Sequence, residues 1–447
     1  MLSIGKLASG QADYYLNLAA ARVVRDLSVA SAVEDYYTGG AEPPGRWRGR
    51  LAREAGLEGA VDGAALRSLL DEPGASDMDA PPPKKVPGYD LTFSAPKSVS
   101  VVFGIAERDT QQLVLDAHRI AVDSALAYIE QEAVRVRRGQ GGHRVIGADG
   151  LLAAAFDHRT SRAGDPQSHT HVLIANTSRG DDGRWSALDG RLIYAHAETA
   201  GYVYQAILRA ELSARIDVGW TARAQGVGEI DGVPAEVLRI LSRRRAEIEE
   251  ELERLGAAGR TAAQVAALAT RRSKDYDVTP ETLMPTWRAR AEEMGFGRSE
   301  LTALLAREPM REPRIAQEDL FAELLAPTGL TAQRSTFTRR DLVQVLSERS
   351  DPSERVTVEG LQSLADAFLA SADVVRVTEV GETRYSVREL VDKAREIVEL
   401  GTRRAQQPIP RASEPSVAAA LERRPRLSSE QREMVFRLVR DDEIMQS

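Results

Sequence analysis

The sequence predicts an α+β fold in which helices flank an antiparallel β-sheet. Strand-like and helix-like segments alternate along the first part of the chain, and Leu151–His158 and His169–Asn176 are two strand candidates separated by a short loop. A short loop joins strands that run antiparallel, because parallel strands need a long crossover connection. From about Ala195 to Phe296 the pattern turns almost wholly helical, so a helical region follows the sheet.

Local patterns predict the other elements of this first part. The apolar residues of Arg108–Glu130 recur at intervals of three and four, which is the spacing of a buried helix face. Val134–Arg138 alternates apolar and basic residues, as a half-exposed strand does. The remaining expected elements are strands at Met1–Lys6, Tyr89–Phe93 and Val99–Phe103, a helix carrying the first tyrosine pair, and a proline-rich connection at Asp77–Pro87.

A small separate module is expected in the C-terminal part. Two helical patterns, Phe337–Arg349 and Val358–Leu369, precede a hairpin pattern at Val374–Ser386. Two helices followed by a β-hairpin predict a winged-helix-like module over residues 310–400, of a kind that binds DNA in some proteins and only packs in others. Thr402–Arg426 is expected to be a linker.

Composition narrows the class of protein. The chain is 43% apolar and 28% charged, as a soluble globular protein is. It contains no apolar run long enough to cross a membrane and no signal-peptide pattern, so no membrane insertion is expected. The absence of cysteine excludes disulfides, thiolate chemistry and cysteine-based zinc sites, and suits a cytoplasmic location. The net charge of −8 excludes a broadly basic surface, so nucleic acid would need a local basic groove or a metal.

Half of the six histidines lie in one short stretch, Phe156–Asn176. His169 and His171 are two positions apart, so on a strand their side chains point to the same face of the sheet. His158 ends the preceding strand and comes within reach of that pair if the two strands are antiparallel. Three neutral imidazoles can hold a divalent metal with coordination positions left open, whereas the plainer interpretation is three polar side chains on a wet sheet face. The other histidines are isolated, and ordinary surface or packing roles are expected for His118, His143 and His196.

Two tyrosine doublets, each preceded by aspartate, lie at residues 14–15 and 36–37. Such doublets usually pack in a core or interface, because tyrosine buries its ring and keeps a polar tip. The functional interpretation has one phenolate attack a phosphodiester, which requires activation because the unperturbed tyrosine pKa is ~10. Asp90, on an expected strand, is a candidate to orient a metal-bound imidazole or to assist deprotonation of the tyrosine.

Together these features resemble the conjugative relaxases of the large relaxase–helicase (MobF) type, which belong to the HUH endonuclease superfamily. The resemblance rests on the opening MLSIGKL, the two DYY doublets, DLTFSAPKSVSVVFG at Asp90–Gly104 and FDHRTSRAGDPQSHTHVLIAN at Phe156–Asn176. A lone HxH pair would be a weak signal, whereas this combination is specific and covers about residues 1–300. It implies a palm of antiparallel strands flanked by helices, with helical fingers that clamp single-stranded DNA.

The resemblance implies a metal-dependent transesterase that nicks one DNA strand at a plasmid transfer origin. It assigns the attack on the scissile phosphate to Tyr14, with Tyr15 as its doublet partner, and gives a 5′-phosphotyrosyl link and a free 3′-OH. Asp90 corresponds to the family's catalytic acidic residue. A tyrosine of the second doublet, Tyr36 or Tyr37, would carry out a second strand transfer that ends the process.

The resemblance also implies a divalent cofactor held by His158, His169 and His171. Mg²⁺ or Mn²⁺ is the family expectation, while imidazole ligands alone would also suit Zn²⁺, Co²⁺ or Ni²⁺. The expected partners are single-stranded DNA at a transfer origin, a conjugative coupling protein and an accessory nicking protein. Several basic residues are candidate contacts to the DNA phosphates, with plain solvation as the alternative. These residues are Lys97, Arg135, Arg137, Arg138 and Arg144.

Two features depart from the family pattern. The doublets are separated by LNLAAARVVRDLSVASAVED, which is longer than the family spacing. Leu427–Leu438 resembles the segment before the first phosphate-binding loop of the family's helicase domain, so residues 401–447 are interpreted as a linker and the truncated start of that domain. No G-x-x-x-x-G-K-[ST] motif occurs in the sequence, so no nucleotide is expected to bind.

The residues leave other functions open. A three-histidine nuclease that uses water would release a free 5′-phosphate without a covalent intermediate. A rolling-circle replication initiator would use the same chemistry at a different DNA site. A DNA-binding scaffold with a structural metal would bind origin DNA and cut nothing.

Overall fold

The structure, a computed structural model, describes residues 2–8, 10–20, 43–70, 86–161, 163–256, 262, 266, 269–270, 280–309, 311, 313–377, 382–405 and 413–440. Packing divides the chain into two compact units, one of Met1–Ala322 with Thr338–Phe368 and the other of Glu323–Phe337 with Leu369–Ser447. None of the helices in these ranges combines the length and the apolar character needed to cross a bilayer.

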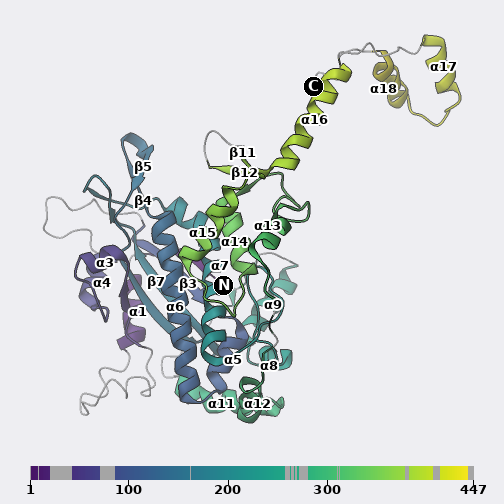
Figure 1. Ribbon diagram of the computed structural model, residues 1–447. Coiled ribbons are helices and arrows are strands. Elements are labelled where there is room, and N and C mark those ends of the chain that lie inside the picture. The colour runs from purple at the N-terminus through teal and green to yellow at the C-terminus, as the bar shows by residue number, and fades with distance from the viewer. Residues whose placement is uncertain are drawn as a thin grey trace, which may run out of the picture. The chain divides into compact units, whose positions relative to one another are not determined.

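The first unit is built on a five-stranded sheet with the strand order β1-β3-β7-β6-β2 (Figure 1). All of the neighbouring strands in this sheet pair antiparallel, which confirms the predicted fold class. Every residue of β6 is buried, because other elements cover both faces of the sheet. The strands are β1 (Leu2–Lys6), β2 (Arg46–Arg48), β3 (Gly88–Ser94), β6 (Ala153–Thr160) and β7 (Pro166–Ala175).

Two long helices, α6 (Arg108–Ala133) and α7 (Gly190–Ile216), lie against one face of this sheet (Figure 1). The contact between His118 of α6 and Thr170 of β7 belongs to this layer. The helix predicted at Arg108–Glu130 from its apolar spacing is confirmed as α6. Ala117, Ala121 and Tyr128 of the predicted face are buried, whereas Leu113 is half-buried and Ile120 is exposed.

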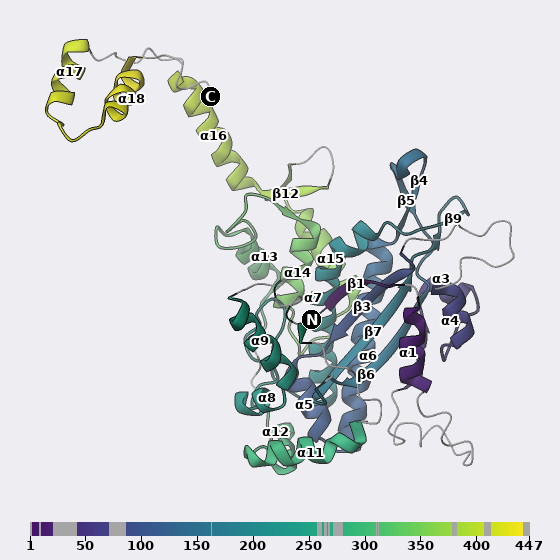
Figure 2. The same ribbon diagram turned by 180° about the vertical axis from the view of Figure 1, so that it is seen from behind.

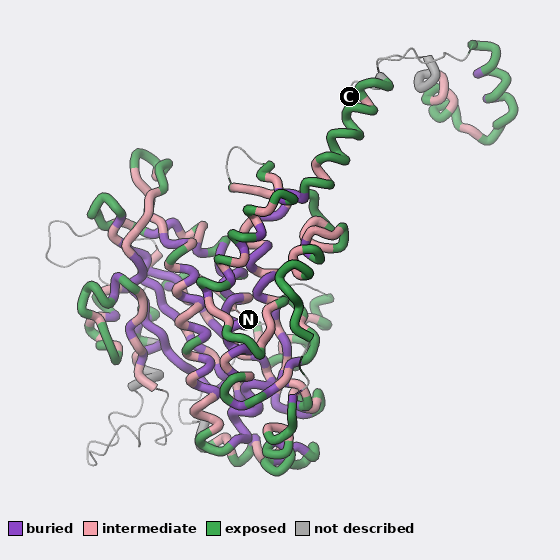
Figure 3. Tube along the Cα trace, viewed as in Figure 1, coloured by how far each residue is buried: buried purple, intermediate pink, exposed green. Residues whose placement is uncertain are grey.

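The opposite face of the sheet carries shorter helices (Figure 2). These are α1 (Gln11–Ala20), α3 (Arg50–Glu54) and α4 (Gly63–Leu70). An apolar core that includes Tyr15, Leu66 and Phe156 joins them to the sheet, and Figure 3 shows the concentration of buried residues in the sheet and in the long helices. This core fixes the backbone of α1 beside the strands that carry the clustered histidines.

The first unit also contains two small β-ribbons and further helices. One ribbon pairs β4 (Arg135–Arg138) with β5 (Arg144–Gly147) around the 3₁₀ turn η1 (Gln140–Gly142), and the other pairs β8 (Ser178–Arg179) with β9 (Trp185–Ser186). The helices are α5 (Lys97–Ile105), α8 (Ala235–Ile240), α9 (Arg243–Leu255), α11 (Pro280–Glu293), α12 (Arg298–Leu305), α14 (Arg339–Arg349) and α15 (Val358–Leu369). At the sequence boundaries between the units lie α13 (Gln317–Leu325) and β10 (Phe337–Thr338).

The strand predicted at Val99–Phe103 is wrong, because these residues belong to helix α5. Residues Ser98–Ile105 are buried on all sides, and a short buried helix shows the same continuous apolar run as a buried strand. The cap of this helix comes from a distant segment, since the Glu229 carboxylate accepts the backbone N–H of Ser98 at 2.7 Å. A local pattern does not contain that contact.

In the second unit, β11 (Val374–Arg376) and β12 (Arg384–Val387) pair antiparallel, as expected for the predicted hairpin. The described residues after the hairpin form α16 (Arg388–Ala405), α17 (Glu414–Glu422) and α18 (Ser429–Arg440). The linker predicted at Thr402–Arg426 is therefore partly helical. Ser413 caps α17 by accepting the N–H of Ser416, and a proline in the first turn favours a helix start.

Both helices expected for the winged-helix-like module are present as α14 and α15. They pack within the first unit, whereas the hairpin belongs to the second. The module itself and the domain boundaries at 1–300, 310–400 and 401–447 stay predictions.

Two of the histidines outside the cluster are buried and hydrogen-bonded. The Nδ1 atom of His118 lies 2.8 Å from the Tyr204 hydroxyl, and the Nδ1 atom of His196 lies 3.0 Å from the Tyr128 hydroxyl. Burial lowers the pKa of each histidine to about 4. Both side chains are therefore neutral in the folded protein near pH 7. A neutral, buried and hydrogen-bonded histidine is compatible with the packing role expected for each.

We expect the free energy of unfolding to fall as the pH is lowered from about 7 to about 5. The unfolded chain protonates His118 below a pKa of about 6.5, while the folded chain does so only near a pKa of about 4, so acid favours the unfolded state within this window. The loss for His118 is on the order of 2 kcal/mol. Urea unfolding at both pH values measures it, and the His118→Gln variant should show a weaker pH dependence. An equally steep dependence in that variant would exclude His118 as the cause.

Candidate active site

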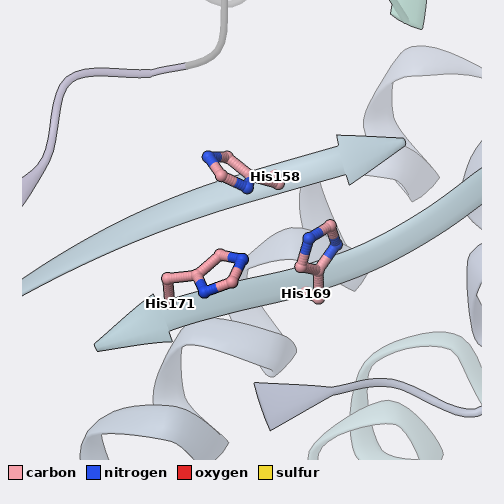
Figure 4. A group of neighbouring side chains, drawn as sticks. All are labelled: His158, His169 and His171. Carbon is pink, nitrogen blue, oxygen red and sulfur yellow. The ribbon is translucent and has the colours of Figure 1, made fainter. Parts of the chain in front are cut away.

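The three clustered histidines come from two neighbouring strands. His158 lies on β6 opposite His169 of β7, and His171 follows two positions further along β7. Their rings converge on one side of the sheet (Figure 4), and one ring nitrogen from each lies within 4.8 Å of the other two. The predicted proximity is thus confirmed, and three nitrogen donors at these separations fit one divalent ion. Their role as metal ligands stays a proposal.

Hydrogen bonds orient two of these rings. The Nδ1–H of His169 donates to the carbonyl oxygen of Gln167 at 2.9 Å, and the Nδ1–H of His171 donates to the Asp90 carboxylate at 2.9 Å. A neutral imidazole that is protonated at Nδ1 has its free lone pair on Nε2. Both rings can therefore bind a metal through Nε2 while they keep these hydrogen bonds.

Asp90 of β3 joins the histidine cluster to the first tyrosine doublet. Besides His171, its carboxylate accepts hydrogen bonds from the Tyr15 hydroxyl at 2.7 Å and from the Thr92 hydroxyl at 3.3 Å. Burial acts to raise the pKa of Asp90, but the hydrogen bonds from His171, Tyr15 and Thr92 outweigh it and lower the pKa. The carboxylate is therefore ionised near neutral pH, and it can accept a proton or orient an imidazole.

The tyrosine that contacts this cluster is the second of the doublet. Tyr15 is only 4% exposed, and its ring centroid lies 5.2 Å from that of His171 and 5.6 Å from that of Phe156. Tyr14 precedes it on α1, and the structure describes its backbone but not its side chain. α1 thus brings the first doublet to the face of the sheet that carries the histidines.

The second doublet cannot be placed in the same way. Tyr36 and Tyr37 lie outside the residues that the structure describes. Their predicted role in a second strand transfer stays a prediction.

The arginines predicted to contact DNA lie on the β4–β5 ribbon, which projects from one end of the first unit (Figure 1). Arg137 forms an ion pair with Asp189 at 2.8 Å, and Arg138 forms two bonds to Asp182 at 2.7 Å. Arg135 donates to the carbonyl oxygen of Val134 at 2.8 Å. Arg144, near the turn, is exposed. Glycines at positive φ, among them Gly139 at 77°, form the turn, where other residues would be strained.

Lys97 lies apart from this ribbon, at the start of α5. Its Nζ donates to the carbonyl oxygen of Pro166 at 2.7 Å, so the amine is engaged with the first residue of β7. Burial lowers the pKa of Lys97 to about 8, although the charges of Asp165 and Glu229 act in the opposite direction. A DNA contact by Lys97 stays a prediction.

Sequence patterns missed several residues around the cluster. One of them is Thr92, whose position two residues after Asp90 on the same strand is a usable signal that both face the same side. Asp157 and Thr170 alternate with the histidines along β6 and β7 and face the other side of the sheet, where they contact α6. Their partners on α6 are distant in sequence, so no local motif contains these contacts.

Residues 8–294 match the protein-family model described as TrwC relaxase, which is well over half of the chain. The chain belongs to the TrwC relaxase family. This membership confirms the resemblance to conjugative relaxases, and the matched residues include four strands of the sheet (β2, β3, β6 and β7), the histidine cluster and the first tyrosine doublet.

Similar curated proteins and solved structures point to the same family. The relaxase-family chain is 35% identical over 277 residues to the multifunctional conjugation protein TraI of Escherichia coli, a stretch that covers 59% of this chain and 15% of that protein. It is similar to the conjugative relaxase TrwC in complex with oriT DNA, in a metal-free structure (28% identity) and in a metal-bound structure (27% identity). Each match has a TM-score of 0.55 and covers 66% of this chain and 99% of the other. The chain thus spans about 15% of the length of the curated relative and nearly all of the solved ones.

Proposed function

We propose that this protein is a site- and strand-specific DNA relaxase, which nicks single-stranded DNA at a transfer origin through a covalent bond to tyrosine. The observation that carries the proposal is the pair of hydrogen bonds to Asp90, one from Tyr15 and one from His171, which joins the tyrosine doublet and the histidine cluster in one site. Membership of the TrwC relaxase family and similarity to a relaxase solved with oriT DNA support the same function.

In the proposed reaction Tyr14 is the nucleophile. Its phenol gives up a proton, its oxygen bonds to phosphorus, and the bond from phosphorus to the 3′ oxygen breaks. The 3′ oxygen leaves with a proton as a free hydroxyl, and the 5′ phosphate stays on the tyrosine. No water is consumed, so the reverse reaction can rejoin the strand.

Asp90 is the proposed proton acceptor in this step. Its ionised carboxylate lies on the same face as the tyrosine doublet and also holds the ring of His171. Tyr15 is proposed to hold Asp90 in place, because its buried hydroxyl is already committed to that carboxylate. We assign the second strand transfer to Tyr36 or Tyr37.

The three histidines, His158, His169 and His171, are proposed to hold a divalent metal. A metal bound there would act as a Lewis acid on an oxygen of the scissile phosphate. The cluster geometry and the metal-bound structure of a related relaxase support a divalent ion. We expect Mg²⁺ or Mn²⁺, and the imidazole donors also suit Zn²⁺, Co²⁺ or Ni²⁺.

The proposed partner is single-stranded DNA at a transfer origin. Because a curated relative is named a multifunctional conjugation protein, we also propose a conjugative coupling protein and an accessory nicking protein as partners. The cytoplasm is the proposed location, where plasmid DNA is accessible.

We expect the Arg144→Ala substitution to weaken DNA binding. The guanidinium is exposed near the turn of the β4–β5 ribbon and can reach a phosphate. Loss of one phosphate contact lowers the slope of log affinity against log salt by about 1. Fluorescence anisotropy over a salt series measures this slope. The control is Arg245→Ala, which removes an exposed arginine of α9 that is ion-paired with Glu249; equal slopes for the two variants would count against the ribbon as a DNA contact.

The proposed function is tested with labelled single-stranded oligonucleotides that tile the DNA around the gene. Protein and Mn²⁺ are incubated with each oligonucleotide, and the products are separated in SDS. A protein–DNA band that is lost in EDTA supports the relaxase. Cleavage without such a band would show a nuclease that uses water, and binding without cleavage would show a scaffold.

A further inference from the structure

The reverse face of the two histidine-bearing strands carries a buried polar network. Asp157 of β6 and Thr170 of β7 are opposite each other in the strand register, one position before His158 and one after His169. Successive side chains on a strand point to opposite faces, so these two residues lie behind the histidines. Asp157 is 5% exposed and Thr170 is fully buried.

Hydrogen bonds link this network across three layers of the fold. The Thr170 hydroxyl donates to Asp157 Oδ1 at 2.8 Å, which ties β7 to β6. Because the hydroxyl has one proton, it accepts at 2.8 Å from Nε2–H of His118 on α6. The other ring nitrogen of His118 then accepts from the Tyr204 hydroxyl of α7 at 2.8 Å.

Two arginines also donate hydrogen bonds to the Asp157 carboxylate. Arg46 of β2 donates to its two oxygens at 3.0 and 3.1 Å, and Arg119 of α6 donates to Oδ2 at 2.9 Å. The carboxylate therefore connects the neighbouring strand β2, the covering helix α6 and the hydroxyl of Thr170. A buried charge with this many partners fixes its strand in one position, since any shift leaves charged groups without partners.

The location of this network matters because the β6–β7 pairing becomes irregular next to it. The register shifts between His158 and Thr160, directly after the pair His158–His169. Such a bulge disrupts the backbone ladder locally. The pair His158–His169 is the last of the regular ladder that begins at Ala153, and pairing resumes in a shifted register at Thr160–Pro166. A slip by one residue would turn a histidine to the other face.

We propose that Thr170 and Asp157 are positioning residues for the metal centre, which hold His158 of β6 and His169 of β7 at the separation that one ion requires. The proposal rests on the proposed metal site. Its basis is that the proposed ligands come from two strands, and that the hydrogen bond from Thr170 to Asp157 ties those strands together next to the pair His158–His169.

The test is a Co²⁺ titration of the full chain without DNA, followed by visible absorption. Thr170→Val removes the hydroxyl but keeps the shape of the side chain. Thr199→Val is the matched control, because Thr199 of α7 is also fully buried and accepts a hydrogen bond, from Gln344 at 2.9 Å. Thr170→Ser restores the hydroxyl, and Asp157→Asn is a second variant that removes the charge.

We expect Thr170→Val to weaken Co²⁺ binding by roughly tenfold. This is the smallest loss of metal affinity that is typical when a side chain supporting the metal ligands is removed. Thr170→Ser and Thr199→Val should bind as the unchanged protein does, and Asp157→Asn should bind at least as weakly as Thr170→Val. Equal affinity of Thr170→Val and Thr199→Val, at equal losses of thermal stability, would overturn the positioning role. If the unchanged protein bound no Co²⁺, the metal site itself would be refuted and the positioning role with it.

Discussion

Replacing Tyr14 with phenylalanine is expected to abolish the covalent protein–DNA adduct while single-stranded DNA still binds. The substitution removes only the oxygen that would bond to phosphorus, so no phosphotyrosyl link can form. Adduct is measured as an SDS-resistant band with origin DNA, and binding is measured by anisotropy under the same conditions. An undiminished adduct would refute the assignment of Tyr14.

Tyr15→Phe is the matched variant on the same helix. It removes the hydrogen bond to Asp90 but keeps the ring that packs on Phe156. A hydrogen bond to a charged group contributes about 1.5–3 kcal/mol, so adduct formation should slow by roughly ten- to a hundredfold and not stop. If Tyr15→Phe lost the adduct completely and Tyr14→Phe kept it, the nucleophile would be Tyr15.

Replacing His169 with alanine is expected to have the second large effect, the loss of metal binding and of adduct together. The ring of His169, a proposed ligand, is fixed by the Gln167 carbonyl, and its removal leaves two imidazoles of the three. Metal affinity should fall by more than about 100-fold, since the loss of an outer-shell partner alone costs about 10–100-fold. Isothermal titration with Mn²⁺ and the adduct assay measure the two effects.

His143→Ala is the control for this substitution. His143 is exposed beside the turn of the β4–β5 ribbon and is not part of the cluster. Its replacement should leave Mn²⁺ affinity unchanged. Equal losses of affinity in the two variants would point to nonspecific binding by surface histidines, and adduct formation by His169→Ala at the normal rate would show that the cluster is not needed for the chemistry.

Much of the candidate site could be predicted from the sequence, because strand alternation is a local property. The two-residue spacing of His169 and His171 places them on one face, and the short loop before them brings His158 alongside. The antiparallel pairing of β6 with β7 follows from the same short loop. These inferences need no information about distant parts of the chain.

Contacts between layers could not be predicted in this way. Tyr15 and Asp90 are 75 positions apart, so no local pattern contains the hydrogen bond between them. His118 and Thr170 are 52 positions apart, so His118 was interpreted as an isolated residue. The strand predicted at Val99–Phe103 failed for a related reason, since complete burial erased the periodicity that separates a helix from a strand.

The most direct test of the central claim is to identify the residue that carries the DNA. Protein trapped on origin DNA is digested with nuclease and trypsin, and the modified peptide is sequenced by mass spectrometry. The proposed relaxase predicts a nucleotide attached through its 5′ phosphate to Tyr14. A DNA product with a free 5′ phosphate and no modified peptide would contradict it.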